Sequence, residues 1–490
     1  MSGKKKERRS EANDDESKKV KFAVDVKEED VEETLGNLRF EDPFSDEEEE
    51  EDSDEMQVHG AFEDEDEEEE DEEDHAPKAP VQVYIPGKGV DKDLELEVDN
   101  TAYEMLHRMT VEWPMLSFDF LPDTLGANRT RFPMTVFAIG GTEADTLDGN
   151  SLVMMRMSQL HRTKHDDDLE ATDSDESDGG GEDDLDDDPE LAHISVKHKG
   201  SVNRVRVMPQ DGSIVASWSG EGKVHIWDLA APLKALQSSP SPAPHFDVQP
   251  AHTVGKHKDE GFALDWSPVA AGVLASGDCA NMIWRTARTE GGAWATDDSG
   301  FKGHTGSVED IQWSPSEAAV FASCSVDQTI RIWDARKKSG AAMSVTAAAC
   351  DVNVIAWNRR VPYLLASGDD QGNLRVWDLR SLKSGEAVGD LGWHTEAVTS
   401  VEWCPEQPSV LAASSSDNQV TIWDMSVERD AEAEAQMAAE GIAIPDLPPQ
   451  LIFIHQGQKD VKEVHWYQQC PGVLGTTSAT GFDVFKTINT

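Results

Sequence analysis

Cysteine and long apolar runs are both scarce in this chain of 490 residues. Five cysteines occur and none belongs to a CxxC pair, so their spacing disfavours a zinc site or a disulfide framework. We interpret them as small buried hydrophobic residues of a protein from a reducing compartment. No apolar run approaches the ~18 residues of a membrane span, and the N-terminus is charged where a secretory signal would be apolar. We therefore expect a soluble, intracellular protein with no membrane partner.

Basic residues are also few, because 43 lysines and arginines face 97 acidic residues and leave a formal net charge of -54. The acids are concentrated in two runs without Lys or Arg: residues 41–74 hold 23 and residues 165–190 hold 15. Such segments are too poor in apolar residues to offset the entropy of ordering, so we predict that they are disordered. A flexible polyanion attracts basic proteins and repels nucleic acid. We expect a basic client protein and no direct nucleic-acid partner; a simple solubility tail is the alternative.

The first 40 residues differ from the two acidic runs because they contain clusters of basic residues. Two basic clusters, at 4–9 and 18–21, have the spacing of a bipartite nuclear-import signal, and a solvated basic tail is the alternative interpretation. The predicted organisation is a basic tail at 1–40, an acidic region at 41–92 and a folded domain at 93–490. That domain carries acidic insertions at 165–190 and 428–450.

One unit, residues 303–334, organises the rest of the chain. Short alternating strands stand on both sides of a Ser-Pro turn, and the unit contains His304, Ser323, Asp327 and Trp333. A buried imidazole needs partners for both nitrogens, and a carboxylate in a turn can supply one. Asp327 is therefore expected to supply one hydrogen-bond partner of His304.

The spacing of this unit recurs along the chain. His394, Asp417 and Trp423 repeat the intervals without a slip, although Ala413 stands in place of the mid-unit serine. Further copies are anchored on Trp227, Trp284 and Trp377, and a degenerate copy runs from Trp466 to Phe485. A Ser/His/Asp set also fits a hydrolase. A catalytic site is built once, however, so the recurrence favours a structural role.

The ends of four units resemble the WD repeat, namely Trp227-Asp228, Trp333-Asp334, Trp377-Asp378 and Trp423-Asp424. In that family each repeat corresponds roughly to one four-stranded propeller blade. A head His, a mid-unit Ser, a turn Asp and a final Trp form a hydrogen-bonded brace in each blade, and the resemblance implies the same brace for His304, Ser323, Asp327 and Trp333. The resemblance implies an all-β fold, a seven-bladed WD-repeat β-propeller. Six blades are expected near 194–230, 251–288, 301–337, 345–380, 391–427 and 452–487, after a first blade without the consensus. We expect Met115 to Phe120 to supply the strand that closes the ring.

Residues 99–109 predict an N-terminal helix. Tyr103, Leu106 and Met109 follow a helical spacing after an Asx residue suited to an N-cap. The segment leads into Glu-Trp-Pro at 112–114. This order resembles the start of the histone-binding WD-repeat proteins related to the retinoblastoma-binding chaperones. In those proteins a helix precedes an EWP-type motif and packs on the side of the propeller.

Residues 428–450 resemble a second feature of the same family, a negatively charged double-proline loop that faces the N-terminal helix. The resemblance implies a groove for a basic helix, since a ring closed by the N-terminal segment brings residues near 100 beside the last blades. The expected groove has an apolar floor of Tyr103, Leu106 and Met109 and an acidic wall of Glu428, Asp430, Glu432 and Glu434. The alternative is a helix that only caps the propeller edge, beside a disordered loop.

With its acidic runs, the whole chain resembles the glutamate-rich WD-repeat proteins of ribosome biogenesis. The resemblance implies a non-enzymatic nuclear and nucleolar chaperone that escorts a basic client, a large-subunit ribosomal protein (number three) and also core histones. We expect no cofactor, no metal site, and a monomer within larger complexes. Two alternatives stay open: a histone-binding chaperone or chromatin-complex subunit, and a ubiquitin-ligase substrate receptor. Arg336 and Arg380 suit the last, because each stands two residues beyond a Trp-Asp dipeptide.

Overall fold

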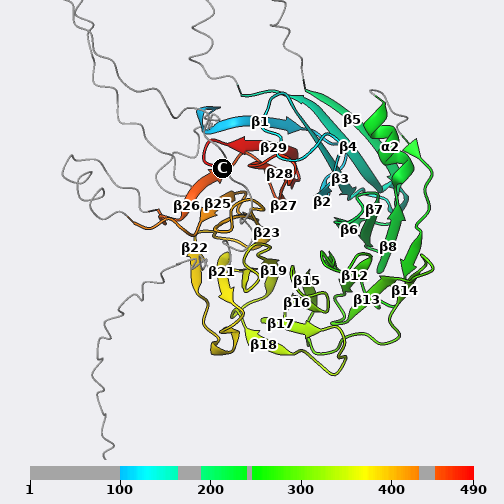
Figure 1. Cartoon of the computed structure of the whole chain (residues 1–490), viewed down its shortest axis with the longest axis vertical. Coiled ribbons are helices and arrows are strands. Elements are labelled where there is room, and N and C mark those ends of the chain that lie inside the picture. Colours follow the sequence, from blue (N-terminus) through cyan, green and yellow to red (C-terminus); the bar gives the residue numbers. More distant parts are fainter. Residues whose placement is uncertain (1–99, 164–188, 240–244, 430–446) are drawn as a thin grey trace, which may run out of the picture. The chain divides into compact units, whose positions relative to one another are not determined.

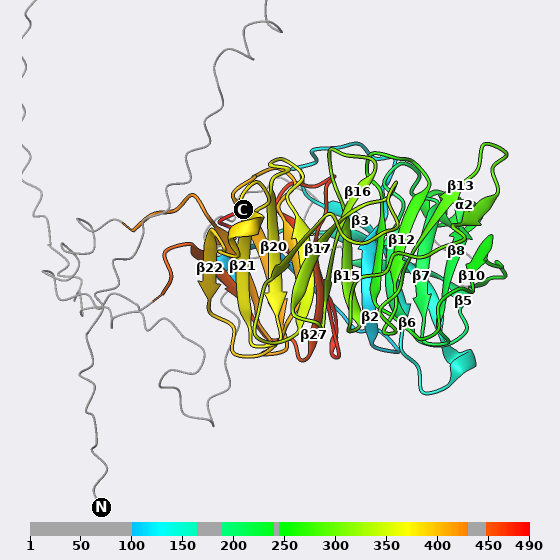
Figure 2. The ribbon, with the colours of Figure 1, turned by 90° about the horizontal axis from the view of Figure 1, so that it is seen from below.

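Seven β-sheets surround a central axis (Figure 1). The computed structural model describes residues 100–163, 189–239, 245–429 and 447–490. Figure 2 views the ring from its side, with the strands running between its two faces. The prediction of an all-β, seven-bladed propeller is confirmed. The predicted basic tail, the acidic region and most of the insertion at 165–190 lie outside the described residues.

The sheets are given from the innermost to the outermost strand. The first contains β2 (Met115–Phe120), β3 (Met134–Thr142), β4 (Ser151–Leu160) and β5 (Glu190–Lys197), with β9 (His245–Phe246) added in parallel. The second contains β6 (Val202–Val207), β7 (Ile214–Ser219), β8 (Lys223–Asp228) and β10 (His252–Val254). The third contains β11 (Ala263–Trp266), β12 (Val273–Gly277), β13 (Ile283–Arg288) and β14 (Trp294–Thr296).

The fourth sheet contains β15 (Val308–Trp313), β16 (Val320–Ser325), β17 (Thr329–Asp334) and β18 (Met343–Thr346). The fifth contains β19 (Val352–Trp357), β20 (Leu364–Asp369), β21 (Asn373–Asp378) and β22 (Gly389–Gly392). The sixth contains β23 (Val398–Trp403), β24 (Val410–Ser415), β25 (Val420–Asp424) and β26 (Leu451–His455). The seventh contains β27 (Val461–Trp466), β28 (Val473–Ser478), β29 (Gly481–Thr487) and β1 (Tyr103–Met109).

The core lies between neighbouring sheets, so the middle strands are covered on both faces. In β16 every residue except Val320 is buried, and the strand reads as a nearly continuous run of small and apolar side chains. The turn between β20 and β21 requires glycine: Gly372 has a φ of +83°, and a Cβ there would lie 2.4 Å from the carbonyl oxygen of His394. Close packing of adjacent sheets thus restricts which residue can occupy a turn, and it also determines which side chains are buried.

The predicted N-terminal helix over 99–109 is wrong in the described part of that range. A short 3-10 turn, η2 (Asn100–Ala102), precedes the strand β1, which pairs antiparallel with β29 so that His107 faces Val484. A bulge between Tyr103 and Met105 interrupts the alternation of buried and exposed side chains. Neighbouring sheets also cover both faces of the strand. Apolar residues therefore fall at spacings that imitate a helix.

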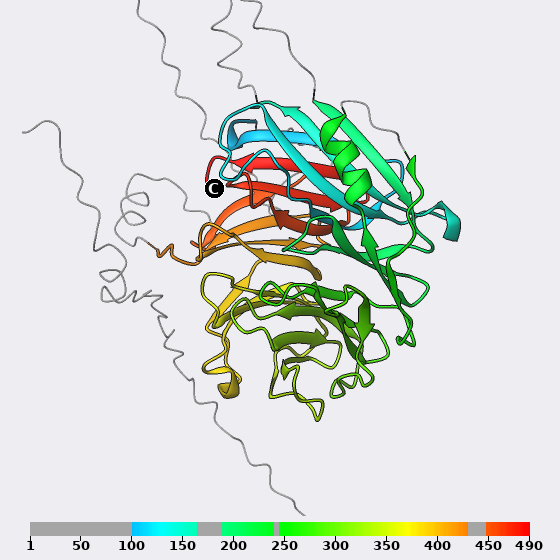
Figure 3. The ribbon, with the colours of Figure 1, turned by 45° about the vertical axis from the view of Figure 1, so that its right-hand side comes forward.

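The closing strand is β1 rather than the predicted Met115 to Phe120. That predicted segment is β2, the innermost strand of the first sheet, and it contacts β6 and β27 of the neighbouring sheets. Figure 3 shows blue β1 beside the red C-terminal strand. The ring is thus closed by a sheet built from both ends of the propeller.

Two further 3-10 turns, η3 (Leu147–Gly149) and η5 (Leu382–Ser384), lie in loops. The helix α2 (Ala230–Ser238) packs on β4 and β5, and buries Leu233 and Leu236 in the core of the first two sheets. In the part of the chain that the structure describes, no helix is both long and apolar enough to cross a bilayer.

Candidate functional site

The repeat unit at 303–334 brings its four signature side chains together. His304 contacts Asp327 through Nδ1 at 2.9 Å and Ser323 through Nε2 at 2.7 Å, and the indole N–H of Trp333 donates to Ser323 Oγ at 2.8 Å. Burial lowers the pKa of His304 to about 4 and outweighs the opposing effect of Asp327. A neutral, 5% exposed imidazole with both nitrogens engaged stabilises the blade and leaves no room for a substrate.

The unit around His394 uses a different hydroxyl. His394 Nδ1 lies 3.0 Å from Asp417, whereas its Nε2 contacts Thr421 Oγ1 at 2.9 Å, and the indole of Trp423 donates to the same oxygen at 2.8 Å. The sequence spacing showed that Ala413 cannot supply the serine hydroxyl of this brace, but it did not identify Thr421 as the replacement. Thr421 could have been found as a hydroxyl residue two positions before Trp423, on the strand adjacent to Ala413.

The three residues expected to form an apolar groove floor do not share one face. Tyr103 is 5% exposed, and its hydroxyl lies 2.8 Å from Nδ1 of His455 on β26. Leu106 packs against the same core as Tyr103, between the sixth and seventh sheets, whereas Met109 packs against the core shared with the first sheet. The floor in its predicted form is therefore wrong, because a strand sends its side chains to two sides.

An apolar surface nevertheless exists where the sixth and seventh sheets meet. Ala102, Leu106, Ile452 and Phe453 are partly buried and pack on one core, and the nearby Ile488, 57% exposed, donates its backbone N–H to the carbonyl of Ala102. We call these five residues the rim patch. The expectation that residues near 100 lie beside the last blades thus holds for the described residues.

Three acidic segments of the sequence are attached around the rim patch. The segment before Asn100 leads directly into β1, and Thr163, after which the insertion at 164–188 begins, donates its backbone N–H to the carbonyl of Glu104 on β1 at 3.0 Å. The segment at 430–446 is flanked by Arg429 and Leu447, close to the start of β26. The guanidinium group of Arg429 donates to the backbone carbonyl of Leu447 at 3.2 Å, so the two ends of the segment lie together. Segments far apart in sequence therefore emerge from one sector of the ring.

Only one member of the predicted acidic wall can be placed. Glu428 is exposed at the start of the loop. Asp430, Glu432 and Glu434 lie outside the described residues.

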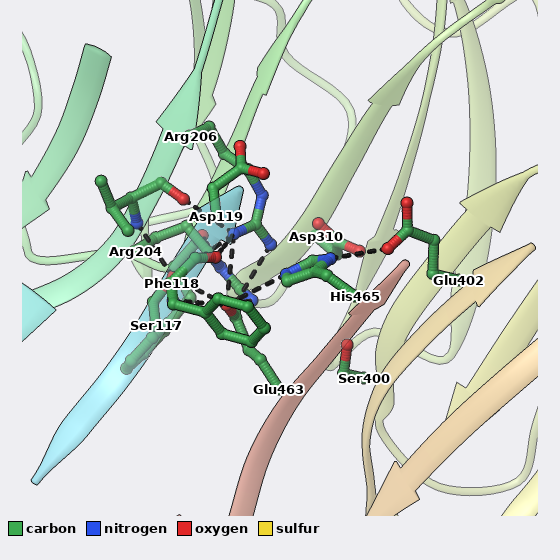
Figure 4. Close-up of polar contacts among 12 residues, drawn as sticks. Ser117, Phe118, Asp119, Arg204, Arg206, Asp310, Ser400, Glu402, Glu463 and His465 are labelled. Atoms are coloured by element: carbon green, nitrogen blue, oxygen red, sulfur yellow. Dashed lines mark hydrogen bonds and ion pairs between the residues drawn. The ribbon is translucent and has the colours of Figure 1, made fainter. Parts of the chain in front are cut away.

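A second group of polar side chains, which sequence reasoning missed, lies at the centre of the ring (Figure 4). Glu463 on β27 is 1% exposed and is paired with Arg204 and with Arg206, the latter at 3.1 Å. The same carboxylate accepts the Ser117 hydroxyl and the backbone N–H of Phe118, both at 2.9 Å. Burial alone would raise the pKa of Glu463, but the two arginines and His465 hold it well below its usual value.

His465 extends this network toward the sixth sheet. Its Nδ1 lies 2.8 Å from Glu402 and its Nε2 lies 3.3 Å from Glu463. Burial lowers the pKa of His465, but the hydrogen bonds and charges of the two carboxylates outweigh that effect and raise it to about 9. The network therefore joins the innermost strands of the first, second, sixth and seventh sheets at the closure of the ring.

The two arginines that follow Trp-Asp dipeptides are exposed and engaged locally. Arg336 is paired with Asp334 at 2.8 Å, and Arg380 is paired with Asp378 at 2.6 Å while it stacks 3.6 Å above the ring of Tyr363. Each side chain is thus presented at the surface in a fixed orientation. Within the described ranges, no group of three His, Cys, Asp or Glu residues is placed to hold a metal ion.

A closed ring of seven sheets with repeated His, Ser or Thr, Asp and Trp braces defines a WD-repeat β-propeller protein. Two family models agree with this class. The model described as "WD domain, G-beta repeat" matches residues 298–334 and 385–424. The model of the "Histone-binding protein RBBP4" family, which also covers a component of the CAF1 complex, matches residues 93–161, which include β1 and the first three strands of the first sheet.

Three relatives align with most of the chain. "Ribosome assembly protein rrb1" of Schizosaccharomyces pombe is 44% identical, over 83% of this chain and 84% of its own length. "Glutamate-rich WD repeat-containing protein 1" of Dictyostelium discoideum is 46% identical, over 85% and 87%. "Protein HEAT STRESS TOLERANT DWD 1" of Arabidopsis thaliana is 42% identical, over 84% and 92%. The chain belongs to the family of glutamate-rich WD-repeat proteins.

Proposed function

We propose that this protein is a non-enzymatic nuclear and nucleolar chaperone that binds a basic client during ribosome assembly. The client is a large-subunit ribosomal protein, number three. The observation that carries the proposal is the attachment of three acidic segments around the apolar rim patch. A relative with 44% identity is named as a ribosome assembly protein, which supports the process.

The two components act on different parts of a basic client. The rim patch offers Leu106, Ile452 and Phe453 to apolar side chains, and the acidic loop begins at Glu428, after the strand β25 that pairs with β26. The acidic segments supply negative charge that attracts cationic chains at long range and competes with nucleic acid for them. A folded docking surface combined with polyanionic arms suits a protein that shields a cationic passenger until assembly.

Reversal of two acidic residues tests the proposal. A chain carrying Glu432→Lys and Glu434→Lys is expected to capture the ribosomal protein about tenfold less well, whereas Glu317→Lys with Glu386→Lys, at exposed positions on other sheets, is the matched control. Tagged proteins are compared by mass spectrometry of the bound fraction before and after a salt wash. Equal losses from both pairs would remove the case for a side groove, and no enrichment of any basic protein would overturn the chaperone function.

Histone binding is the second candidate, favoured by the match of residues 93–161 to a histone-binding family model. The same capture experiment separates the two, because histones rather than a ribosomal protein would then dominate the bound fraction. A ubiquitin-ligase receptor is the third, favoured by the exposed Arg336 and Arg380. Loss of a co-purifying ligase adaptor on replacement of both arginines by alanine would support it.

A further inference from the structure

The fourth strands of the seven sheets differ in how well their outer edges are protected. A strand at the edge of a sheet turns half of its backbone N–H and C=O groups outward, where they can pair with another chain. The two longest fourth strands are partly covered: β5 pairs with β9, and β1 accepts a backbone N–H from Thr163. Four others, β10, β14, β18 and β22, have only three or four residues each. Short or covered edges of this kind discourage pairing between molecules.

The strand β26 of the sixth sheet lacks both kinds of protection. It has five residues, Leu451 to His455, and the first four are apolar and partly exposed. Among the described strands, only β25 pairs with it, on its inner side. An open apolar edge is a template for a strand from another chain. The sixth sheet is therefore the one best suited to accept an added strand.

The hydrogen bonds of β25 show which backbone groups of β26 point outward. Asp424 on β25 donates its N–H to the carbonyl of Gln450, just before β26. Because backbone groups alternate in direction along a strand, Ile422 also faces β26, where it is paired with Phe453. The N–H and C=O groups of Ile454, the next residue, therefore point away from β25.

A side-chain amide already bonds to this edge. Asn489, two residues beyond the end of β29, donates its Nδ2 hydrogen to the carbonyl of Ile452 at 3.0 Å. Ile452 lies two residues before Ile454, on the same edge of the strand. An exposed amide group thus contacts β26 as the peptide group of a neighbouring strand would. The outward carbonyls of β26 are accessible acceptors.

The surroundings of β26 indicate the composition of the strand that it would accept. Ile452 and Phe453 belong to the rim patch, so one side of the added strand needs apolar residues. The sequence at 430–446, which precedes β26, contains five acids and no Lys or Arg, so basic residues are favoured as well. A second copy of this chain, with its own net charge of -54, would be repelled. Alternating apolar and basic residues meet both requirements, because successive side chains of a strand point to opposite sides.

We propose that β26 binds an extended segment of the client, with alternating apolar and basic residues, as a fifth strand of the sixth sheet. The inference rests on the proposed function, since it states how the rim patch holds the same basic client. Backbone hydrogen bonds at Ile454 supply affinity, and the alternating side chains supply selectivity. A basic helix bound in a groove would differ, because a helix satisfies its own backbone groups and leaves the Ile454 N–H unpaired.

A proline on the edge tests the added strand. Ile454→Pro removes the outward N–H and leaves the bonds between β25 and β26 in place, and proline is tolerated on edge strands. The full chain with this change is expected to capture the large-subunit ribosomal protein about tenfold less well, because one backbone bond is lost and its partner is left unpaired. Ile454→Ala keeps the N–H and is expected to retain most of the capture.

Ser344→Pro on β18 is the matched control. Gln328 accepts the N–H of Ala347, and the same alternation turns the backbone of Ser344 away from β17. The control therefore also removes an outward N–H from a fourth strand, and it is expected to leave capture unchanged. Similar unfolding temperatures of the two proline variants show that a difference in capture does not come from a damaged ring.

Hydrogen exchange of the unaltered chain is an independent measurement. The amide of Ile454 is expected to exchange at least tenfold more slowly in the client complex, whereas the amides of Phe453 and His455, already paired with β25, change little. Unchanged exchange at Ile454, or equal capture by the two proline variants, would overturn the added strand and leave the proposed function standing. Protection of Ile454 that increases with chain concentration in the absence of client would assign the edge to a second copy and also overturn it. Failure of the unaltered chain to capture any basic protein would overturn both proposals.

Discussion

At the scale of the residue, His465 controls charge at the ring closure. Because its pKa is raised to about 9, its protonated form contributes stability that is complete below about pH 6.5 and is lost as the pH rises through 9. That contribution is about 3 kcal/mol if the unfolded value is normal. We expect His465→Gln to lower the unfolding temperature at pH 6.5 and to flatten the profile between pH 6.5 and 9.5, measured by scanning calorimetry.

His225→Gln is the matched control for that measurement. Burial lowers the pKa of His225 to about 4, so this histidine stays neutral over the whole range and its replacement leaves the slope unchanged. An identical slope in the unaltered protein and in His465→Gln would contradict the assignment of a buried positive charge to His465.

Individual residues also mark where sequence reasoning succeeds. One repeat unit could be predicted from sequence because its signature residues, His304, Ser323, Asp327 and Trp333, all lie within about 30 positions of one another. The sequence spacing could not supply Thr421, since the missing hydroxyl of one strand is replaced from the adjacent strand. Nor did it identify Glu463, whose partners Arg204 and Ser117 are far away in the chain.

At the scale of the element, β1 is the strand on which closure depends. Met105 is 0% exposed within it, and a buried, unpaired carboxylate is strongly unfavourable. Met105→Glu is therefore expected to release β1 and expose the backbone of β29. Hydrogen exchange is expected to rise at least tenfold in a peptide covering 481–487 and much less in one covering 308–334.

Thr110→Glu adds the same charge just beyond β1, at an exposed position, and is expected to preserve the slow exchange. Equal hydrogen-exchange rates in the two variants would contradict this role of β1. Loss of protection in all seven sheets would show that β1 cannot detach without unfolding the rest of the ring.

The helix predicted at 99–109 also belongs to this scale. Strands are recognised from sequence by alternation of apolar and polar residues. In β1 both faces are covered and a bulge shifts the register, so that alternation is absent. Its partner β29 lies at the other end of the domain's sequence. A local sequence pattern carries no information about pairing between such distant segments. The seven-sheet ring could be predicted because the other blades repeat a local signal.

At the scale of the whole molecule, charge and fold are separable. Deletion of residues 41–74 removes 23 acids and leaves every described strand in place. We expect the deleted chain to keep its unfolding temperature while its capture of the basic client weakens and the client aggregates more readily. Sedimentation of the client at physiological salt, with and without the chaperone, measures both the capture and the aggregation of the client.

A chain in which a neutral Gly/Ser linker of equal length replaces 41–74 controls for length. Unchanged capture at physiological salt would count against the shielding role, and a lowered unfolding temperature would count against separate folding of the propeller.

The seventh sheet has a consequence for biosynthesis. Its outer strand is translated first, whereas its other three strands are translated last. While residues 481–487 are still within the ribosomal exit tunnel, β1 has no neighbour to join, so the circle can be completed only after β29 has emerged from the ribosome. A prematurely terminated product lacking 481–487 would keep an open edge, which offers quality-control factors a direct way to tell it from the finished protein.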